Sequence, residues 1–224
     1  MESENNKKDY LDEIIYQIEE SARVVDLKDY LNSYHKPDQF IKYCKGCDRY
    51  CKSWACPPFD FDTKDYFKPF RSIVIISTKI MPHSSLNDWI KEGRCTMSEL
   101  YKVLLRKERK RLDEMLLKAE SLFHGSRACF AGNCHFCKPE DCTKQHGKAC
   151  RFPEKIRPSI EALGCDVANT MSEVANIKLL WSKDGLLPQY YCLVSAILLT
   201  NKEDEQTIKL SLKNVGFELN LQNV

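Results

Sequence analysis

The sequence predicts an α+β fold: a ferredoxin-like βαββαβ sandwich with a cysteine-rich metal-binding insertion and an N-terminal helical, cysteine-rich extension. Three observations lead to this prediction. Residues 72–78 form a continuous β-branched run, which is typical of a buried strand. Residues 98–123 carry apolar side chains at helical spacing. Residues 190–200 form a second long strand-like run, and four cysteines at 134–150 interrupt the chain before it.

The elements follow in chain order. Residues 9–34 are expected to be helical, because isoleucines and valines form a loose apolar face there. Lys36-Pro37-Asp38 predicts a turn. Ser98 is the expected cap of the long helix, and Gly125 follows its end. Glu108 breaks the apolar stripe of this helix, so part of the helix is expected to project from the core or to pack on a partner.

The second half continues the same alternation. A short strand at 127–132 is expected to lead into the second cysteine group. After that group we expect a short helix at 158–164, the start of a third strand at 165–167, a helix at 171–181 and a turn at 185–188. The predicted division is a helical arm at 1–40, a metal-binding domain at 41–200 and a tail at 201–224.

Composition narrows the class of protein. The 224 residues include 34 basic and 32 acidic side chains, so no overall charge favours nucleic acid or an anionic membrane. The chain opens without a secretory signal, and no stretch approaches the ~18 apolar residues of a membrane span. We therefore expect a soluble cytoplasmic protein. The basic run 106–111 could be a partner surface, but such runs are more often solvated helix faces.

Twelve cysteines require an explanation, since cytosolic disulfides are rare and clustered cysteines more often bind metal. Each of two groups opens with Cys-x2-Cys and ends near proline, a spacing that iron–sulfur clusters favour and that a four-thiolate zinc site can also use. The first group is Cys44, Cys47, Cys51 and Cys56, and the second is Cys134, Cys137, Cys142 and Cys150.

Other candidate ligands fit less well. His135 and His146 lie within the second group, but four cysteines are already available there. The isolated cysteines are expected to pack as small buried hydrophobic residues; they are Cys95, Cys129, Cys165 and Cys192. We find no glycine-rich phosphate loop and no G-x-S-x-G elbow.

Two motifs are specific enough to compare with known families. The first is Cys44-x2-Cys47-x2-Tyr50-x3-Trp54-x-Cys56-Pro57-Pro58. The second comprises Gly132-x-Cys134-x2-Cys137, Cys150-Arg151-x-Pro153 and Arg157-Pro158-Ser159-x-Glu161-Ala162-x-Gly164-x-Asp166-Val167. Over roughly residues 40–200 these motifs resemble a family of predicted metal-binding proteins, domain of unknown function 2284. The resemblance implies metal binding, with a 4Fe–4S cluster and no established reaction. Two positions depart from the family pattern: Cys51 stands where a small or polar residue is usual, and Cys165 where an aliphatic one is common.

The role of Cys51 decides between two functions. If Cys51 is a ligand, two complete four-cysteine sites suit electron transfer. If it is not, Cys44, Cys47 and Cys56 could hold a cluster with one open iron, which suits chemistry on a small molecule. A zinc-stapled adaptor module is the third alternative.

The expected cofactor is one or two 4Fe–4S clusters, with zinc as the alternative, in electron transfer or small-molecule reduction. The expected partner is a redox protein or a small-molecule substrate, without nucleic acid or membrane. Side chains expected near the metal are Tyr50, Trp54, Arg151, Arg157, Glu161 and Asp166.

Overall fold

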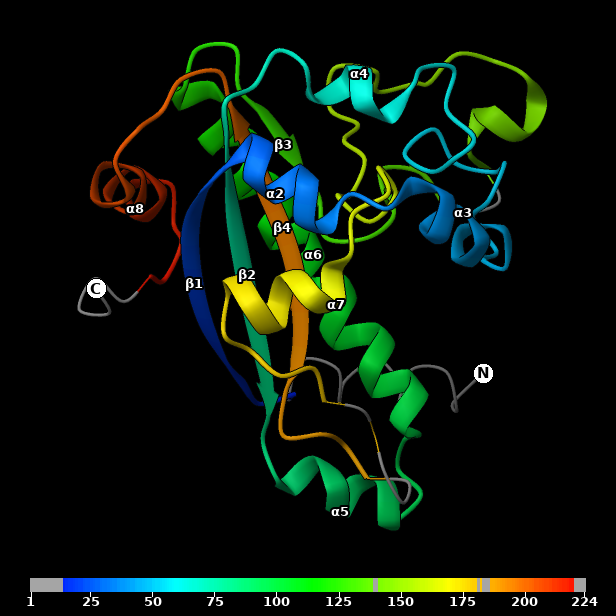
Figure 1. Cartoon of the computed structure of the whole chain (residues 1–224). Coiled ribbons are helices and arrows are strands. Elements are labelled where there is room, and N and C mark those ends of the chain that lie inside the picture. The colour runs from blue at the N-terminus through cyan, green and yellow to red at the C-terminus, as the bar shows by residue number, and fades with distance from the viewer. Residues whose placement is uncertain (1–13, 139–140, 181, 183–185, 220–224) are drawn as a thin grey trace.

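A four-stranded antiparallel sheet, with strands in the order β1-β2-β4-β3, forms the centre of the computed structural model (Figure 1). The structure describes residues 14–138, 141–180, 182 and 186–219. The strands are β1 (Tyr16–Asp26), β2 (Ser72–Pro82), β3 (Arg127–Cys129) and β4 (Tyr191–Leu199). The fold is therefore α+β, as predicted.

Both faces of the central strands are buried. Side chains alternate between the two faces of a strand, so Val74 and Ile76 of β2 enter one hydrophobic core while Ile73 and Ile75 enter another. This explains why the run has no polar alternation. The predicted strands at 72–78 and 190–200 are confirmed, and the short strand predicted at 127–132 is confirmed at its first three residues, Arg127–Cys129.

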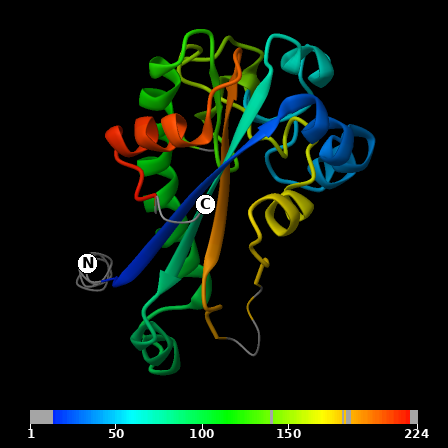
Figure 2. The same cartoon turned by 60° about the vertical axis from the view of Figure 1, so that its left-hand side comes forward.

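Helices α6 (Met97–Leu122) and α8 (Glu205–Asn214) cover one face of the sheet (Figure 2). Leu112 and Leu116 of α6 share a core with Ile208 and Leu212 of α8. The long helix is confirmed, but its cap is Thr96, whose side chain accepts a hydrogen bond from the Glu99 backbone in a capping box.

Shorter helices cover the opposite face and the ends of the sheet. Tyr30 and Met171 lie in the core of that second face. The helices are α2 (Leu27–Tyr34), α3 (Pro37–Lys45), α4 (Thr63–Phe67), α5 (Ser85–Lys91) and α7 (Val167–Asn169), with a π-helical turn η3 (Thr170–Val174) and a 3₁₀ turn η2 (Thr143–His146). No helix in the described residues is long and apolar enough to cross a membrane.

The helix predicted at 9–34 is wrong over most of its described part. Residues 16–26 form β1, which pairs with β2 along its whole length, from Tyr16 opposite Pro82 to Asp26 opposite Ser72. Its inward side chains follow a period of two, with Glu20 and Ala22 buried. The buried glutamate hid this alternation in the sequence. Only α2 is helical in this segment, and residues 9–13 lie outside the described part.

The elements predicted after the second cysteine group also need correction. Residues 160–164 form turns, and the strand predicted at 165–167 is reduced to an isolated bridge between Cys165 and His35. The helix predicted at 171–181 is the short turn η3, and residue 181 lies outside the described part, as does most of the turn at 185–188. The ferredoxin-like arrangement is not confirmed, since β1 rather than that third strand completes the sheet.

Glu108 is buried inside the fold, contrary to the expectation that part of α6 projects from the core. The Tyr16 hydroxyl donates a hydrogen bond to Glu108 at 2.6 Å, and Arg111 Nε donates another at 2.7 Å. Arg111 also pairs with Glu20 on β1 at 2.7 Å. The acidic side chain is tolerated because it is paired, and it joins α6 to β1.

Candidate metal-binding site

The first cysteine group occupies a chain of tight turns at the end of α3. Cys44 lies in the last turn of this helix, and the Cys47 backbone N–H donates to the Cys44 carbonyl at 3.0 Å. Such a turn places two thiols of a Cys-x2-Cys motif side by side. Cys51 has a left-handed backbone with φ of 61°, and its N–H donates to the Pro57 carbonyl at 3.0 Å. This hydrogen bond closes the loop behind Cys56.

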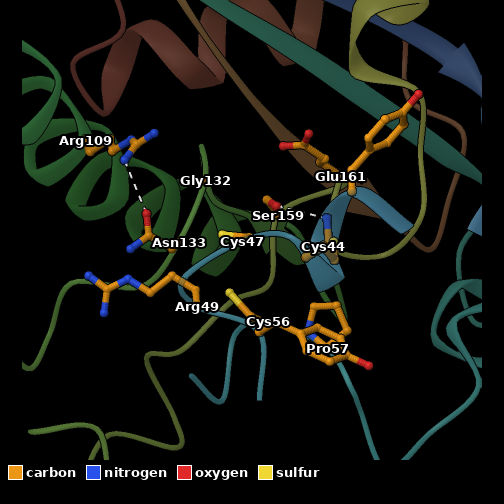
Figure 3. Close-up of a pocket in the computed structure, with 13 residues that line it drawn as sticks. Cys44, Cys47, Arg49, Cys56, Pro57, Arg109, Gly132, Asn133, Ser159 and Glu161 are labelled. Atoms are coloured by element: carbon orange, nitrogen blue, oxygen red, sulfur yellow. Dashed lines mark hydrogen bonds between the residues drawn. The ribbon is translucent and has the colours of Figure 1, made fainter. Parts of the chain in front are cut away.

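Three of the four cysteines of the first group line a cavity of about 250 Å³ (Figure 3). Cys44, Cys47 and Cys56 line it, whereas Cys51 does not; Cys47 and Cys51 are both exposed. The other walls come from α6, from the segment after β3 and from the turns at 159–162. Their side chains and those of the cysteine loop are Tyr43, Arg49, Tyr50, Pro57, Arg109, Asn133, Ser159, Glu161 and Ala162, with Gly132.

The second group surrounds a smaller space. A cavity of about 20 Å³ is lined by its four cysteines, Cys134, Cys137, Cys142 and Cys150. The Phe152 N–H donates to Cys150 Sγ at 3.4 Å, and Arg151 Nη1 lies 3.7 Å from Cys137 Sγ. Donors aimed at sulfur stabilise thiolate ligands, as in iron–sulfur proteins.

The two groups lie side by side, although 78 positions separate Cys56 from Cys134 in the chain. Trp54 Nε1 donates to the Lys148 carbonyl at 3.2 Å. Lys144 Nζ donates to the carbonyls of Cys56 and Pro58, each at 2.8 Å. Arg49 lines both cavities.

Burial keeps several of these thiols protonated in the absence of metal. It raises the pKa of Cys44, and it raises the pKa values of Cys56 and Cys134 to about 11 each. A metal must therefore displace protons from these thiols when it binds. Among the described residues, no three histidine, cysteine, aspartate or glutamate side chains already converge as a site for one metal ion.

Four of the six side chains expected near the metal lie beside the cysteines. Tyr50 and Glu161 line the larger cavity. Trp54 joins the two cysteine loops, and Arg151 contacts the second group and donates to the Asp141 carbonyl at 3.0 Å. Partial desolvation raises the pKa of the Glu161 carboxyl, although a nearby guanidinium opposes this shift.

The other two expected side chains have structural partners. Arg157 is 4% exposed and makes two hydrogen bonds to the Glu120 carboxylate, from Nε at 2.7 Å and from Nη2 at 2.5 Å. Asp166 accepts from the Asn169 N–H at 3.1 Å as the cap of α7, and it pairs with Lys36 at 3.1 Å. Neither lines either cysteine cavity.

The histidines of the second group lie outside both cavities, and the isolated cysteines pack as expected. His135 and His146 do not line the cysteine cavities, and His135 Nε2 lies 3.4 Å from Asp113. The isolated cysteines pack with apolar residues; Cys95, Cys129 and Cys165 are buried, and Cys192 is partly buried.

Sequence reasoning missed Arg49, Arg109 and Asn133 as cavity residues. Arg109 lies within the basic run 106–111, a pattern more typical of a solvated helix face. Its spacing gives one signal: Arg109 follows Leu105 by four residues, so it flanks the buried stripe of α6. No signal marks Arg49 or Asn133 beyond their position next to cysteines.

The chain is therefore a cysteine-rich α+β protein in which three cysteines of the first group and all four of the second line adjacent cavities. The chain is a member of the family described as predicted metal-binding protein (DUF2284), whose family model matches residues 32–199. The resemblance seen in the cysteine motifs is thereby confirmed. No curated protein and no solved structure matches the chain.

Proposed function

We propose that the protein is an iron–sulfur redox protein with two unequal metal centres. Cys44, Cys47 and Cys56 would hold a 4Fe–4S cluster whose fourth iron has no protein thiolate. The second group of four cysteines would hold a closed centre. The observation that carries this proposal is the larger cavity, which three cysteines of the first group line and Cys51 does not. The reaction class is small-molecule reduction, with electrons entering from a redox partner.

The cavity supports a cluster rather than a single ion at the first group. Its volume of about 250 Å³ exceeds what one zinc ion needs, and it leaves room for a ligand beside the thiols. A cluster with an open iron supplies one-electron redox chemistry and a Lewis acid. Tyr43 and Tyr50 stand at the cavity wall, and Glu161 presents a carboxyl group that can hold a proton.

The conformation of Cys51 supports a structural role for this residue. The side chain of Cys51 is exposed, and its backbone has a left-handed conformation. This conformation costs a non-glycine residue about 1 kcal/mol or more. The Cys51 N–H closes the loop on the Pro57 carbonyl. These features form the loop that carries Cys56, and they leave the Cys51 thiol outside the cavity.

The second centre suits electron delivery to the first. All four of its thiols line one cavity, so no ligand position is left for substrate. The hydrogen bonds from Lys144 and Trp54 hold the two cysteine loops in contact. Hydrogen bonds to Cys137 and Cys150 would tune the potential of this centre.

One observation favours a zinc ion in the second group. Its cavity of about 20 Å³ fits a single ion without expansion. In that case the second group would be a structural staple, and electrons would reach the first centre directly from the partner.

Metal and sulfide analysis of protein purified without oxygen tests the proposal. About eight irons and eight sulfides per chain, with absorption near ~400 nm that dithionite bleaches, would support two clusters. About four irons with one zinc would support a cluster beside a zinc staple. A colourless protein with two zincs would refute the redox function and leave a zinc-stabilised binding module.

A further inference from the structure

Arg109 has an unusual environment for a partly buried arginine. Its Nη1 donates to the neutral Asn133 side chain at 3.3 Å, and its Nε is buried without a hydrogen-bond partner. Within the described part of the chain it forms no ion pair, whereas Arg111 and Arg157 are each paired with buried or partly buried glutamates. Two acidic groups act on Arg109 only from beyond ion-pair distance: Asp113, one helical turn along α6, whose pKa burial raises to about 8, and Glu161 at the cavity wall. Because no carboxylate contacts the guanidinium, the site favours an anion from outside the chain.

Gly132 lies directly against this guanidinium. A Cβ at Gly132 would lie 2.7 Å from Arg109 Nη2, so any other residue would require the guanidinium to move. Gly132 also has a φ of +87°, a conformation that glycine adopts without strain. Both residues line the cavity of Cys44, Cys47 and Cys56, and Asn133 lies between Arg109 and the cysteines in Figure 3.

The remaining walls set the charge of a suitable ligand. Arg49 also lines the cavity and forms no ion pair within the described residues, and Glu161 is the one carboxylate among the lining residues. Glu161 and the net negative charge of a thiolate-ligated cluster offset most of the two guanidinium charges, so the site favours a single negative charge over a dianion. Arg109 still has Nη2 and one N–H of Nη1 available, and this planar fork matches the two oxygens of a carboxylate.

We propose that Arg109, oriented by Asn133 and Gly132, anchors a small monocarboxylate in the cavity beside Cys44, Cys47 and Cys56. This inference rests on the proposed function, because it identifies the carboxylate as the ligand class of the open centre. The carboxylate binds at the α6 wall, and the rest of the molecule faces the three thiols. The cavity volume of about 250 Å³, shared with the metal centre, limits the ligand to a few heavy atoms.

Isothermal titration calorimetry on protein purified without oxygen tests the anchor, with acetate, glycolate and pyruvate as probes and acetamide as the neutral counterpart. At least one carboxylate should bind once per chain with a Kd of about 1 mM or tighter, and acetamide should not bind. Arg109→Gln should weaken binding about 10- to 100-fold, as expected for lost charge-assisted hydrogen bonds. The carboxylate affinity of Arg109→Lys should lie between those of the parent protein and Arg109→Gln. Arg106→Gln is the matched control, since Arg106 is exposed on the same helix and outside the cavity.

Circular dichroism and iron content of each variant separate the possible failures. Carboxylate binding that does not depend on Arg109, or no binding to an iron-containing protein, would overturn the anchor and leave the proposed function standing. Loss of iron in Arg109→Gln without loss of carboxylate affinity would assign Arg109 to charge compensation of the cluster, which also overturns the anchor. Arg109-dependent binding by a protein that contains no iron would support the anchor and refute the proposed function.

Discussion

Lys144 holds the two cysteine loops together, and Lys144→Met should loosen the first of them. Its ammonium group donates to the Cys56 and Pro58 carbonyls, each at 2.8 Å, and lies 5.5 Å from the centre of the Trp54 ring. A hydrogen bond to a charged group is worth about 1.5–3 kcal/mol, and we take that range for the pair because Lys144 is half-buried. The equilibrium between closed and open forms of the first loop should therefore shift about 10- to 150-fold toward the open form.

Iron release to a chelator under anaerobic conditions measures this shift, because iron leaves the first centre only when the loop that carries its thiolates opens. The early phase of release should accelerate by about the same factor, while the second centre should release its metal at the original rate. Lys148→Met is the matched control, since that side chain is exposed in the same loop. Equal release rates in Lys144→Met and the parent protein, or equal acceleration at both centres, would refute this account of the contact.

Two further predictions concern α6, which carries the cavity wall. Arg111→Met leaves the buried carboxylates of Glu20 and Glu108 without their cation. It should therefore lower the free energy of unfolding by about 3–5 kcal/mol and Tm by about 6–20 °C in calorimetry. A loss of stability no larger than that caused by Arg106→Met, at an exposed position, would contradict the ion-pair assignment. Burial raises the pKa of Asp113 to about 8 against the opposing charge of Arg109, so its contribution to stability should be full below pH 4 and decline between pH 4 and 8. Urea unfolding should show this decline in the parent protein relative to Asp113→Asn, by up to about 1.4 kcal/mol per pH unit, and parallel pH profiles of the two proteins would contradict it.

The sequence predicts those elements whose pattern depends on local burial. The strand β2 and the helix α6 are recognisable because a continuous β-branched run and a helical apolar stripe each report a buried surface directly. The strand β1 is not recognisable, because Glu20 occupies an inward position that only its pairing with Arg111 makes possible. That pairing joins residues 91 positions apart, so no short stretch of the sequence contains both of them.

The sequence identifies some residues of the candidate site, whereas others can be found only from the tertiary structure. Cysteine spacing identifies both groups, since ligands of one centre must lie close together along a tight turn. The position of Cys51 outside the larger cavity depends on the fold of the loop up to Pro57, which spacing does not encode. Arg109 reaches the cavity only because α6 packs beside the segment after β3, so its role requires the tertiary structure.

The difference between Cys51→Ser and Cys56→Ser tests the central claim most directly. Both variants would be purified without oxygen and compared with the parent protein by iron and sulfide content and by electron paramagnetic resonance after reduction. We predict that Cys51→Ser retains the full iron content and an unchanged signal, whereas Cys56→Ser loses the first centre, about four irons per chain, and keeps the second. If Cys51→Ser lost as much iron as Cys56→Ser, all four cysteines of the first group would be ligands and the open, substrate-binding centre would be excluded.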